Sequence, residues 1–132
     1  MRYMFLIYSC ETSDRSAIDI EDVKSRHVAV MQEAARQGVL QGAEPLQPTS
    51  TATTVRAASA KPVIMDGPFA ETKEQLAGYY ILECKDLDEA ISWAAKIPTG
   101  CKGTEGCIEI RPLIWPASIG VESALNMTGC GH

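Results

Sequence analysis

Two segments of the chain are apolar on both alternations of an extended strand. In residues 2–8, Tyr3, Phe5 and Ile7 lie on one side of the strand, and Met4, Leu6 and Tyr8 lie on the other. Residues 79–84, Tyr-Tyr-Ile-Leu-Glu-Cys, repeat this two-sided pattern. Since successive side chains of a strand point to opposite faces, a sheet built on these segments must be covered on both faces.

Two amphipathic helices are available to cover one face. Within residues 20–37 apolar side chains recur at intervals of three and four, and Gly38 ends the helix. This stripe contains Val23, His27, Val30, Met31 and Ala34. The second helix begins after Asp86, which stands three residues before Glu89 as in a capping box, and stops at Pro98. Its predicted buried stripe contains Leu87, Ala90, Ile91, Ala94 and Ala95.

The remaining segments predict strands and turns. Residues 39–40 begin a short strand, residues 51–56 and 62–65 form a hairpin, and residues 107–112 form the last strand. The strand at residues 63–65 reads as a covered one. Residues 72–75, Thr-Lys-Glu-Gln, have the form of a capping box and predict one short helical turn that Gly78 closes.

This order of elements predicts an α+β fold. It is close to a ferredoxin-like βαββαβ subunit with an added hairpin, in which an antiparallel sheet carries both helices on one face. The other face of the sheet is apolar as well, and a patch of that size on a monomer is unusual. We therefore expect the sheet to pack on a second copy of the chain, as a homodimer.

Length and composition fit one soluble domain. A chain of 132 residues, 45% hydrophobic and 22% charged, is long enough for one core. We expect residues 1–113 to form this domain and residues 114–132, which are weakly patterned, to form a C-terminal tail. A net charge of −5 without a basic cluster argues against nucleic acid and membrane partners. No segment has the roughly 20 apolar residues of a membrane span, and the N-terminus does not resemble a secretory leader, so a cytoplasmic location is predicted.

The cysteines predict neither disulfides nor a metal site. They are odd in number, scattered and never in a Cys-x-x-Cys pair, at Cys10, Cys84, Cys101, Cys107 and Cys130. We expect reduced thiols. Cys101 with Cys107, and Cys130 with His132, lack the two closely spaced ligand pairs of a structural zinc site. The sequence also has no phosphate loop or dinucleotide fingerprint, so no metal or organic cofactor is predicted.

His27 and Asp66 are the candidate catalytic residues. His27 lies on an apolar helix stripe, so its imidazole is expected to face the sheet, where a carboxylate would orient it and raise its basicity. Asp66 follows three apolar residues and precedes the constrained Gly67-Pro68 turn, which makes it the candidate carboxylate. The alternatives are a histidine bonded to a backbone carbonyl and an aspartate that holds its own Asx-type turn.

Five further side chains are candidate ligand contacts, namely Tyr8, Phe69, Glu71, Lys73 and Tyr80. The two tyrosines present hydroxyls either to a cavity or to a dimer seam. Phe69 either fills the core or stacks on a ligand. Glu71 and Lys73 either contact substrate or form a solvated helix start.

Three separated motifs carry a resemblance to a known family. They are residues 3–8, the block Asp-Gly-Pro-Phe-Ala-Glu-Thr-Lys-Glu at 66–74 with Gly78-Tyr79-Tyr80, and residues 86–95 with Pro98 and 109–112. Across residues 1–113 the chain resembles the DGPF group of the YCII-related proteins. The resemblance implies a ferredoxin-like subunit, a dimeric α+β barrel and a cleft between helices and sheet.

The resemblance also bears on function. Some YCII-like domains are dehalogenating or isomerising enzymes that use a His and an Asp, and some DGPF-type proteins accompany extracytoplasmic-function sigma factors. Arg26-His27 followed by residues 37–42 resembles the segment that carries the YCII histidine. Ala43-Glu44-Pro45 departs from the Ala-Gly-Pro that YCII proper tends to have.

Two functions of different class follow. The first is an enzyme that performs metal-independent acid/base chemistry, of isomerase or lyase type, on a small organic molecule, with His27 as base and Asp66 as its orienting or acidic partner. The alternative is a non-catalytic small-molecule-binding or regulatory module, linked through the resemblance to sigma-factor systems. A purely structural dimer is a third hypothesis.

Overall fold

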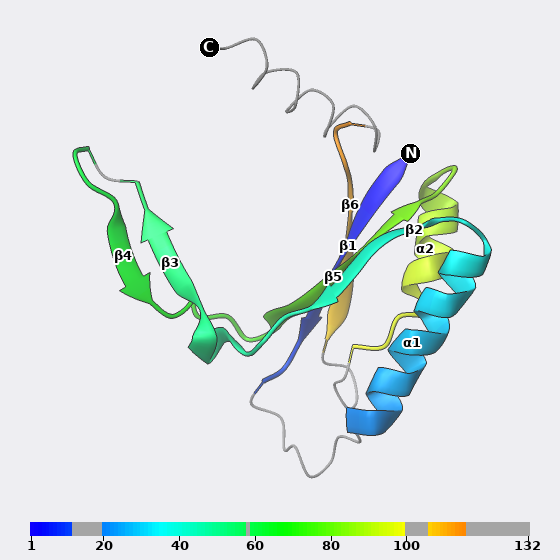
Figure 1. The fold of residues 1–132 in the computed structure, drawn as a ribbon, viewed down its shortest axis with the longest axis horizontal. Coiled ribbons are helices and arrows are strands. Elements are labelled where there is room, and N and C mark those ends of the chain that lie inside the picture. Colours follow the sequence, from blue (N-terminus) through cyan, green and yellow to red (C-terminus); the bar gives the residue numbers. More distant parts are fainter. Residues whose placement is uncertain (12–19, 58, 100–105, 116–132) are drawn as a thin grey trace.

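A four-stranded antiparallel sheet forms the centre of the chain (Figure 1). The computed structural model describes residues 1–11, 20–57, 59–99 and 106–115. The strands of this sheet are β1 (Arg2–Ser9), β2 (Leu40–Pro45), β5 (Gln75–Glu83) and β6 (Cys107–Pro112), in the order β2-β5-β1-β6. With the β3–β4 hairpin set aside, this is the strand order of the predicted ferredoxin-like α+β fold, which is confirmed.

Both helices pack on one face of the sheet (Figure 1). Helix α1 (Ile20–Arg36) carries acidic residues in its first turn, and the turn that follows it contains Gly38, whose φ of 73° is easily reached by glycine. Helix α2 (Leu87–Ala94) begins at Asp86, whose carboxylate accepts the backbone N–H of Glu89 at 2.9 Å. The predicted cap is therefore confirmed.

The predicted buried stripe of α2 is wrong in part. Leu87 and Ile91 are half exposed, whereas Ala90 and Trp93 are buried, with Ile97 just beyond the helix. Burying the large indole of Trp93 turns α2 so that the face through Ala90 and Trp93 meets the sheet, and the face through Leu87 and Ile91 turns to solvent.

The core lies between the helices and the sheet. Strands β1 and β5 supply alternate residues to it, and the register sets Tyr3 opposite Leu82 and Phe5 opposite Tyr80. The buried cluster comprises Tyr3, Phe5, Ile7, Val30, Ala34, Tyr80, Leu82, Cys84, Ala90, Trp93 and Ile97. This packing fixes which side chains of β5 point toward α1.

The other face of the sheet, here called the open face, is apolar along its centre. Cross-strand pairs join Met4 to Ile81, Leu6 to Tyr79 and Tyr8 to Leu76. These six side chains are of intermediate exposure, because neighbours on the sheet shield one another. The two-sided apolar pattern predicted for β1 and β5 is confirmed.

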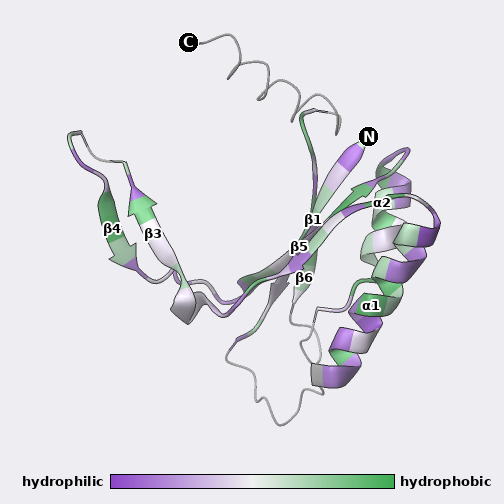
Figure 2. Cartoon of the chain, in the orientation of Figure 1, coloured by the Kyte–Doolittle hydropathy of each residue, from purple (hydrophilic) through white to green (hydrophobic). Residues whose placement is uncertain are grey.

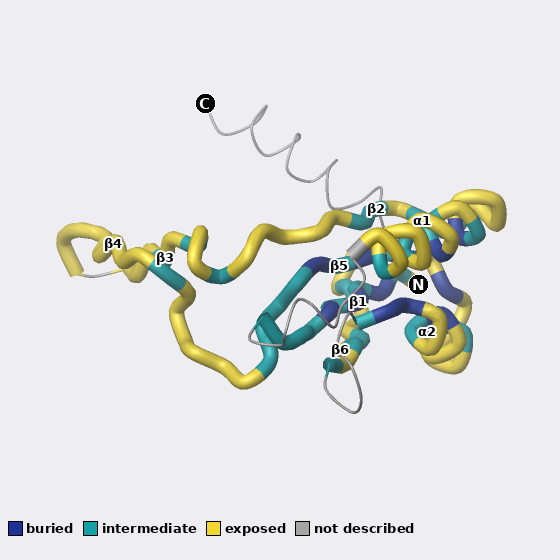
Figure 3. Tube along the Cα trace, turned by 90° about the horizontal axis from the view of Figure 1, so that it is seen from below, coloured by how far each residue is buried: buried dark blue, intermediate teal, exposed yellow. Residues whose placement is uncertain are grey.

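Residues 46–74, here called the arm, project from the sheet on the side opposite the helices (Figures 1 and 3). The arm contains a short 3-10 helix (Thr49–Thr51) and the strands β3 (Thr53–Arg56) and β4 (Val63–Asp66), which pair only with each other. The predicted hairpin is therefore present. The expectation that residues 63–65 form a covered strand is wrong within the chain, because every residue of β4 is exposed although most are hydrophobic (Figures 2 and 3).

The helical turn predicted at residues 72–75 is absent. The Thr72 hydroxyl donates to the carbonyl of Glu74, and Gln75 already begins β5, which continues through Gly78. Gln75 pairs with Ser9 of β1, so the chain enters the sheet at this point, and this pairing outweighs the local capping signal.

Several predictions concern residues outside the described ranges. Cys101, Cys130 and His132 lie there, as does most of the predicted tail, from residue 116 onward. Within the described ranges, neither helix has the length and apolar character needed to cross a membrane.

Candidate ligand-binding pocket

A cavity of about 550 Å³ lies between α1 and the β2–β5 side of the sheet. Its wall is mainly apolar, and the few polar side chains on it include His27, Tyr80, Lys24 and Thr99. The remaining lining residues are Ile7, Ser9, Val23, Val28, Met31, Ala43, Glu44, Pro45, Ala77 and Gly78.

Helix periodicity brings His27 to this wall. Val23, His27 and Met31 follow one another at intervals of four residues, so they lie on one side of α1 and all three line the cavity. Val30 and Ala34, at intermediate positions on the same helix, are buried in the core. The expectation that His27 faces the sheet is thus confirmed.

Strand alternation brings Tyr80 to the opposite wall. On β5 it lies between Gly78 and Leu82 on the helix-facing side, and it pairs with Phe5 on β1 and Ala43 on β2. Gly78 is required there for a different reason. A Cβ at Gly78 would lie 2.8 Å from the carbonyl oxygen of Glu44, so only glycine allows β2 to approach β5 so closely.

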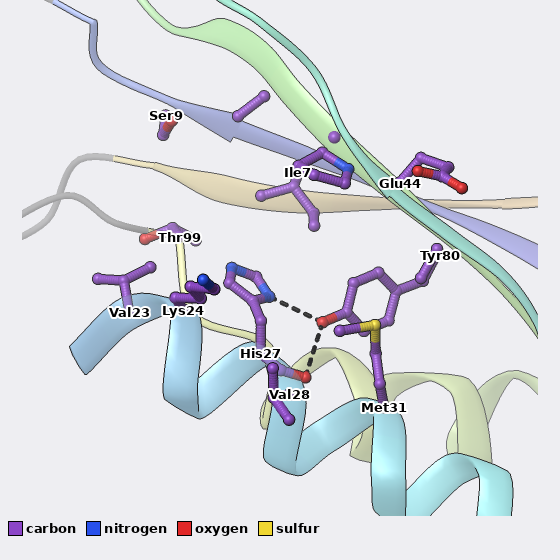
Figure 4. Close-up of a pocket in the computed structure, with 14 residues that line it drawn as sticks. Ile7, Ser9, Val23, Lys24, His27, Val28, Met31, Glu44, Tyr80 and Thr99 are labelled. Atoms are coloured by element: carbon purple, nitrogen blue, oxygen red, sulfur yellow. Dashed lines mark hydrogen bonds between the residues drawn. The ribbon is translucent and has the colours of Figure 1, made fainter. Parts of the chain in front are cut away.

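His27 and Tyr80 are joined by a hydrogen bond (Figure 4). Nδ1 of His27 lies 2.7 Å from the Tyr80 hydroxyl, and that hydroxyl also lies 3.4 Å from the backbone carbonyl oxygen of His27. The two rings are tilted by 58° with centroids 5.9 Å apart. The second ring nitrogen of His27 points away from Tyr80, into the space bordered by Ile7 and Thr99 (Figure 4).

Burial keeps both groups neutral. It lowers the pKa of His27 below its usual 6.5, and the positive charge of Arg26 lowers it further. Burial raises the pKa of the Tyr80 hydroxyl to about 12. Around neutral pH the pair is therefore an uncharged imidazole and an intact phenol.

One arrangement of protons satisfies both contacts of the Tyr80 hydroxyl. If Nδ1–H of His27 donates to the hydroxyl oxygen, the hydroxyl hydrogen can point to the His27 carbonyl, and Nε2 keeps its lone pair toward the cavity. In the opposite tautomer the hydroxyl donates to Nδ1, and Nε2–H becomes a donor. The first tautomer offers a base to a bound molecule, and the second offers a hydrogen bond.

Of the seven predicted site residues, only His27 and Tyr80 line this cavity. Tyr8 belongs to the open face, where it pairs with Leu76. Asp66 ends β4, which pairs with β3 in the arm and not with the sheet under α1, so the predicted partnership of Asp66 with His27 is not formed here. The structure does not bring His27 and Asp66 together around this cavity.

The alternative role predicted for Asp66, an Asx-type turn, is also absent. Within the described residues its carboxylate makes no hydrogen bond. The turn is held instead by Gly67, whose N–H donates to Ala52 at 2.7 Å and whose carbonyl accepts the Thr54 hydroxyl at 2.7 Å. Gly67 has a φ of 94°, which a side chain would disfavour.

The other three predicted contacts lie in the arm and are exposed. Phe69 is 75% exposed, so the expectation that it fills the core is wrong within the chain. Glu71 and Lys73 are exposed as well, beside a segment that is not helical. Their use as ligand contacts stays a prediction.

Sequence reasoning missed Lys24, Thr99 and the partnership of His27 with Tyr80. Lys24 carried a weak signal, because it stands three residues before His27 and shares a helix side with it. Thr99 follows Pro98 in a loop, where no periodicity indicates direction. The His27–Tyr80 pair depends on how α1 crosses β5, which a local pattern does not encode.

The described cysteines stand outside this pocket. Burial raises the pKa of the Cys84 thiol to about 11, and Glu89 adds to the shift. Burial and the hydrogen bond to Glu74 raise the pKa of the Cys107 thiol. Both groups are therefore protonated thiols of low reactivity at neutral pH.

Comparison with known proteins gives a consistent assignment. Residues 1–115 match the family described as the YCII-related domain. An uncharacterized protein of Rhizobium meliloti (strain 1021) is 40% identical over 115 residues, which cover 86% of this chain and 92% of that relative.

Proposed function

This chain belongs to the YCII-related family, and we propose that it binds a small, mainly apolar organic molecule in the pocket beside His27. The observation that carries the proposal is the pocket itself. Its volume of about 550 Å³, its apolar wall and its few converging polar groups have the make-up of a preformed small-molecule site, for which roughly 300–1,000 Å³ is usual.

The polar groups favour a particular kind of ligand. The neutral His27–Tyr80 pair offers one ring nitrogen to the cavity, and the Lys24 side chain, which is exposed, stands at its border. A ligand with an apolar body and one polar or anionic group would place the body against Val23, Met31 and Ala77. Its polar group would then meet His27 or Lys24.

Proton transfer by His27 is the second candidate, and the 2.7 Å bond to Tyr80 favours it. A neutral imidazole held by a phenol through Nδ1 presents Nε2 as a general base without a carboxylate partner. Nε2 would take a proton from one atom of the ligand and return it to another, as in an isomerisation. In this form Tyr80 has the orienting role that the sequence prediction gave to Asp66.

The proposed setting is the cytoplasm, where thiols such as Cys84 stay reduced. A regulatory role beside extracytoplasmic-function sigma factors rests on the family resemblance alone.

A thermal-shift screen of small organic acids, amides and phenols tests the binding proposal. Val23→Trp is designed to fill the cavity, and Ile91→Trp, on the exposed side of α2, is its matched control. We expect hits that stabilise the wild type and Ile91→Trp but not Val23→Trp. Failure of every compound, or hits that persist in Val23→Trp, would contradict the proposal.

An NMR titration of the His27 ring with a confirmed hit separates binding from proton transfer. A base that acts on the ligand is expected to change its pKa when the ligand binds, and His27→Gln should then abolish turnover but keep binding. Binding that leaves the pKa of His27 unchanged, without turnover of the compound, would contradict proton transfer and favour a non-catalytic binding module.

A further inference from the structure

We propose that the molecule bound in this pocket is a small carboxylic acid, held as its anion. The carboxylate lies at one end of the cavity, here called the donor end, which is formed by Ser9, Lys24, Thr99 and Nε2 of His27. The inference rests on the binding function proposed above and names the chemical class of the ligand. It does not depend on proton transfer by His27.

The polar groups of the donor end have no partners of their own. Across the described part of the chain, the side chains of Ser9, Lys24 and Thr99 make no hydrogen bond or ion pair. Nδ1 of His27 is bonded to the Tyr80 hydroxyl, which leaves Nε2 toward the cavity. Ser9 and Thr99 are only partly exposed, so a ligand that completes their hydrogen bonds stabilises them. The donor end therefore favours a polar group of the ligand.

Three segments of the chain bring these groups to the same end. Ser9 follows Ile7 by two residues on β1, so both side chains lie on the helix-facing side of the sheet, and both line the cavity. Lys24 and His27 are three residues apart on α1 and share one side of it. Thr99 comes from the loop after α2. In Figure 4 Ser9, Lys24 and Thr99 lie on the side of the His27 ring toward which Nε2 points.

The hydrogen-bonding chemistry of the donor end matches a carboxylate. The ammonium group of Lys24 only donates, both hydroxyls can donate, and Nε2 of His27 donates in one of its two tautomers. A carboxylate only accepts, and its negative charge strengthens each hydrogen bond. An amine would bring a second positive charge to Lys24. A phosphate ester would bring roughly two negative charges to the one cationic side chain among the described lining residues, so a monoanion fits better.

The electrostatic potential at the donor end favours an anion as well. Glu44 is the only acidic residue among the described residues that line the cavity, and it pairs with Tyr79 of β5, whose side chain lies on the open face. Strand alternation therefore turns the Glu44 carboxylate away from α1. The positive charge of Arg26 acts at His27 and adds to that of Lys24. An acid is thus attracted to this end although the whole chain has a net charge of −5.

Tyr80 allows His27 to become a donor without moving its ring. In the tautomer with hydrogen on Nε2, the Tyr80 hydroxyl donates to Nδ1 across the same 2.7 Å contact that both tautomers use. Only the longer contact of this hydroxyl, 3.4 Å from the His27 carbonyl oxygen, is given up. A bound carboxylate needs a donor at Nε2 and therefore selects this tautomer.

Isothermal titration calorimetry of the full chain with matched compounds tests the assignment. Phenylacetate and octanoate are the acids, and each is compared with its primary amide and with the amine of the same carbon skeleton. Lys24→Gln removes a cation whose side chain is exposed, so the core is untouched. Lys61→Gln, in the arm and outside the pocket, removes the same charge and is the matched control.

We expect the wild type and Lys61→Gln to bind at least one acid on the order of tenfold more tightly than its amide and its amine. Lys24→Gln should lose this preference and keep its affinity for the amide, and Lys24→Arg should restore the preference. In nitrogen-15 NMR spectra of the acid complex, the His27 ring should carry hydrogen on Nε2.

Equal binding of acid and amide to the wild type would overturn the carboxylate assignment and leave the pocket as a binding site. An acid complex with a lone pair on Nε2, or an acid preference that both lysine variants keep or both lose, would also overturn the assignment. Binding of no compound, or acid binding that persists in Val23→Trp, would overturn the assignment together with the proposed function.

Discussion

Removal of the Tyr80 hydroxyl tests the geometry of the pocket most directly. Tyr80→Phe keeps the buried ring, so no large cavity forms, and it deletes only the hydroxyl that lies 2.7 Å from Nδ1 of His27. One well-formed hydrogen bond contributes about 1 kcal/mol net, and the bonded groups lie at a cavity that water can enter. We therefore expect Tyr80→Phe to lower the free energy of unfolding by about 1 kcal/mol, which for a chain of this size lowers Tm by roughly 4 °C.

The assay is urea unfolding followed by tryptophan fluorescence, to which the buried Trp93 and the exposed Trp115 both contribute, at one fixed protein concentration. Tyr3→Phe is the matched control, because Tyr3 is also buried and its hydroxyl makes no hydrogen bond within the described residues. It should change stability by less than about 0.5 kcal/mol. Equal effects of the two substitutions, with an unchanged NMR titration of His27, would refute the hydrogen-bonded pair.

Three further predictions address strand packing, capping and pH. Gly78→Ala brings a Cβ to 2.8 Å from the Glu44 carbonyl oxygen and should destabilise the chain by roughly 1–3 kcal/mol; a neutral result in thermal unfolding would mean that β2 and β5 can separate freely. Asp86→Ala should cost about 1 kcal/mol in urea unfolding through loss of the α2 cap, whereas the half-exposed Ile91→Ala should cost less, and the reverse order would contradict the orientation of α2. The pKa of His27 is lower in the folded chain than its usual 6.5, so below pH 6.5 the unfolded chain binds a proton more readily than the folded chain, and the free energy of unfolding should fall as the pH falls. His27→Gln should make the free energy of unfolding less dependent on pH below 6.5, and an unchanged dependence would refute the lowered pKa.

The sequence predicted those parts of the fold that repeat in a local pattern. The two-sided apolar character of β1, the stripe of α1 and the cap at Asp86 are each set by residues a few positions apart, and the structure has all three. The hairpin was also recognised. The position of the hairpin outside the central sheet was not predicted, because the apolar run before Asp66 indicates a strand but does not indicate what packs on it.

Only one member of the central pair of the candidate site, His27, was placed correctly from the sequence. Periodicity alone was enough to bring His27 to the sheet. The identity of the partner of His27 depends on the tertiary arrangement: α1 crosses β5, where Tyr80 faces the helix, and β4 with Asp66 belongs to a separate sheet. The strong Asp66-Gly67-Pro68 signal marks a turn in the arm. The sequence prediction placed this motif at the pocket of His27, but the topology places it in the arm.

The way the arm leaves the sheet has an evolutionary consequence. Strands β2 and β5 are antiparallel neighbours, and the N–H of Leu46 still donates to the carbonyl of Ala77 at 2.8 Å before the two chain segments part. Two chain ends held together in this way can be joined by a tight turn or by an insertion of many residues, because the entropic cost of closing a loop grows only slowly with its length. The length and composition of the arm can therefore change between relatives while the register of β2 and β5, and with it the wall of the pocket, stays the same.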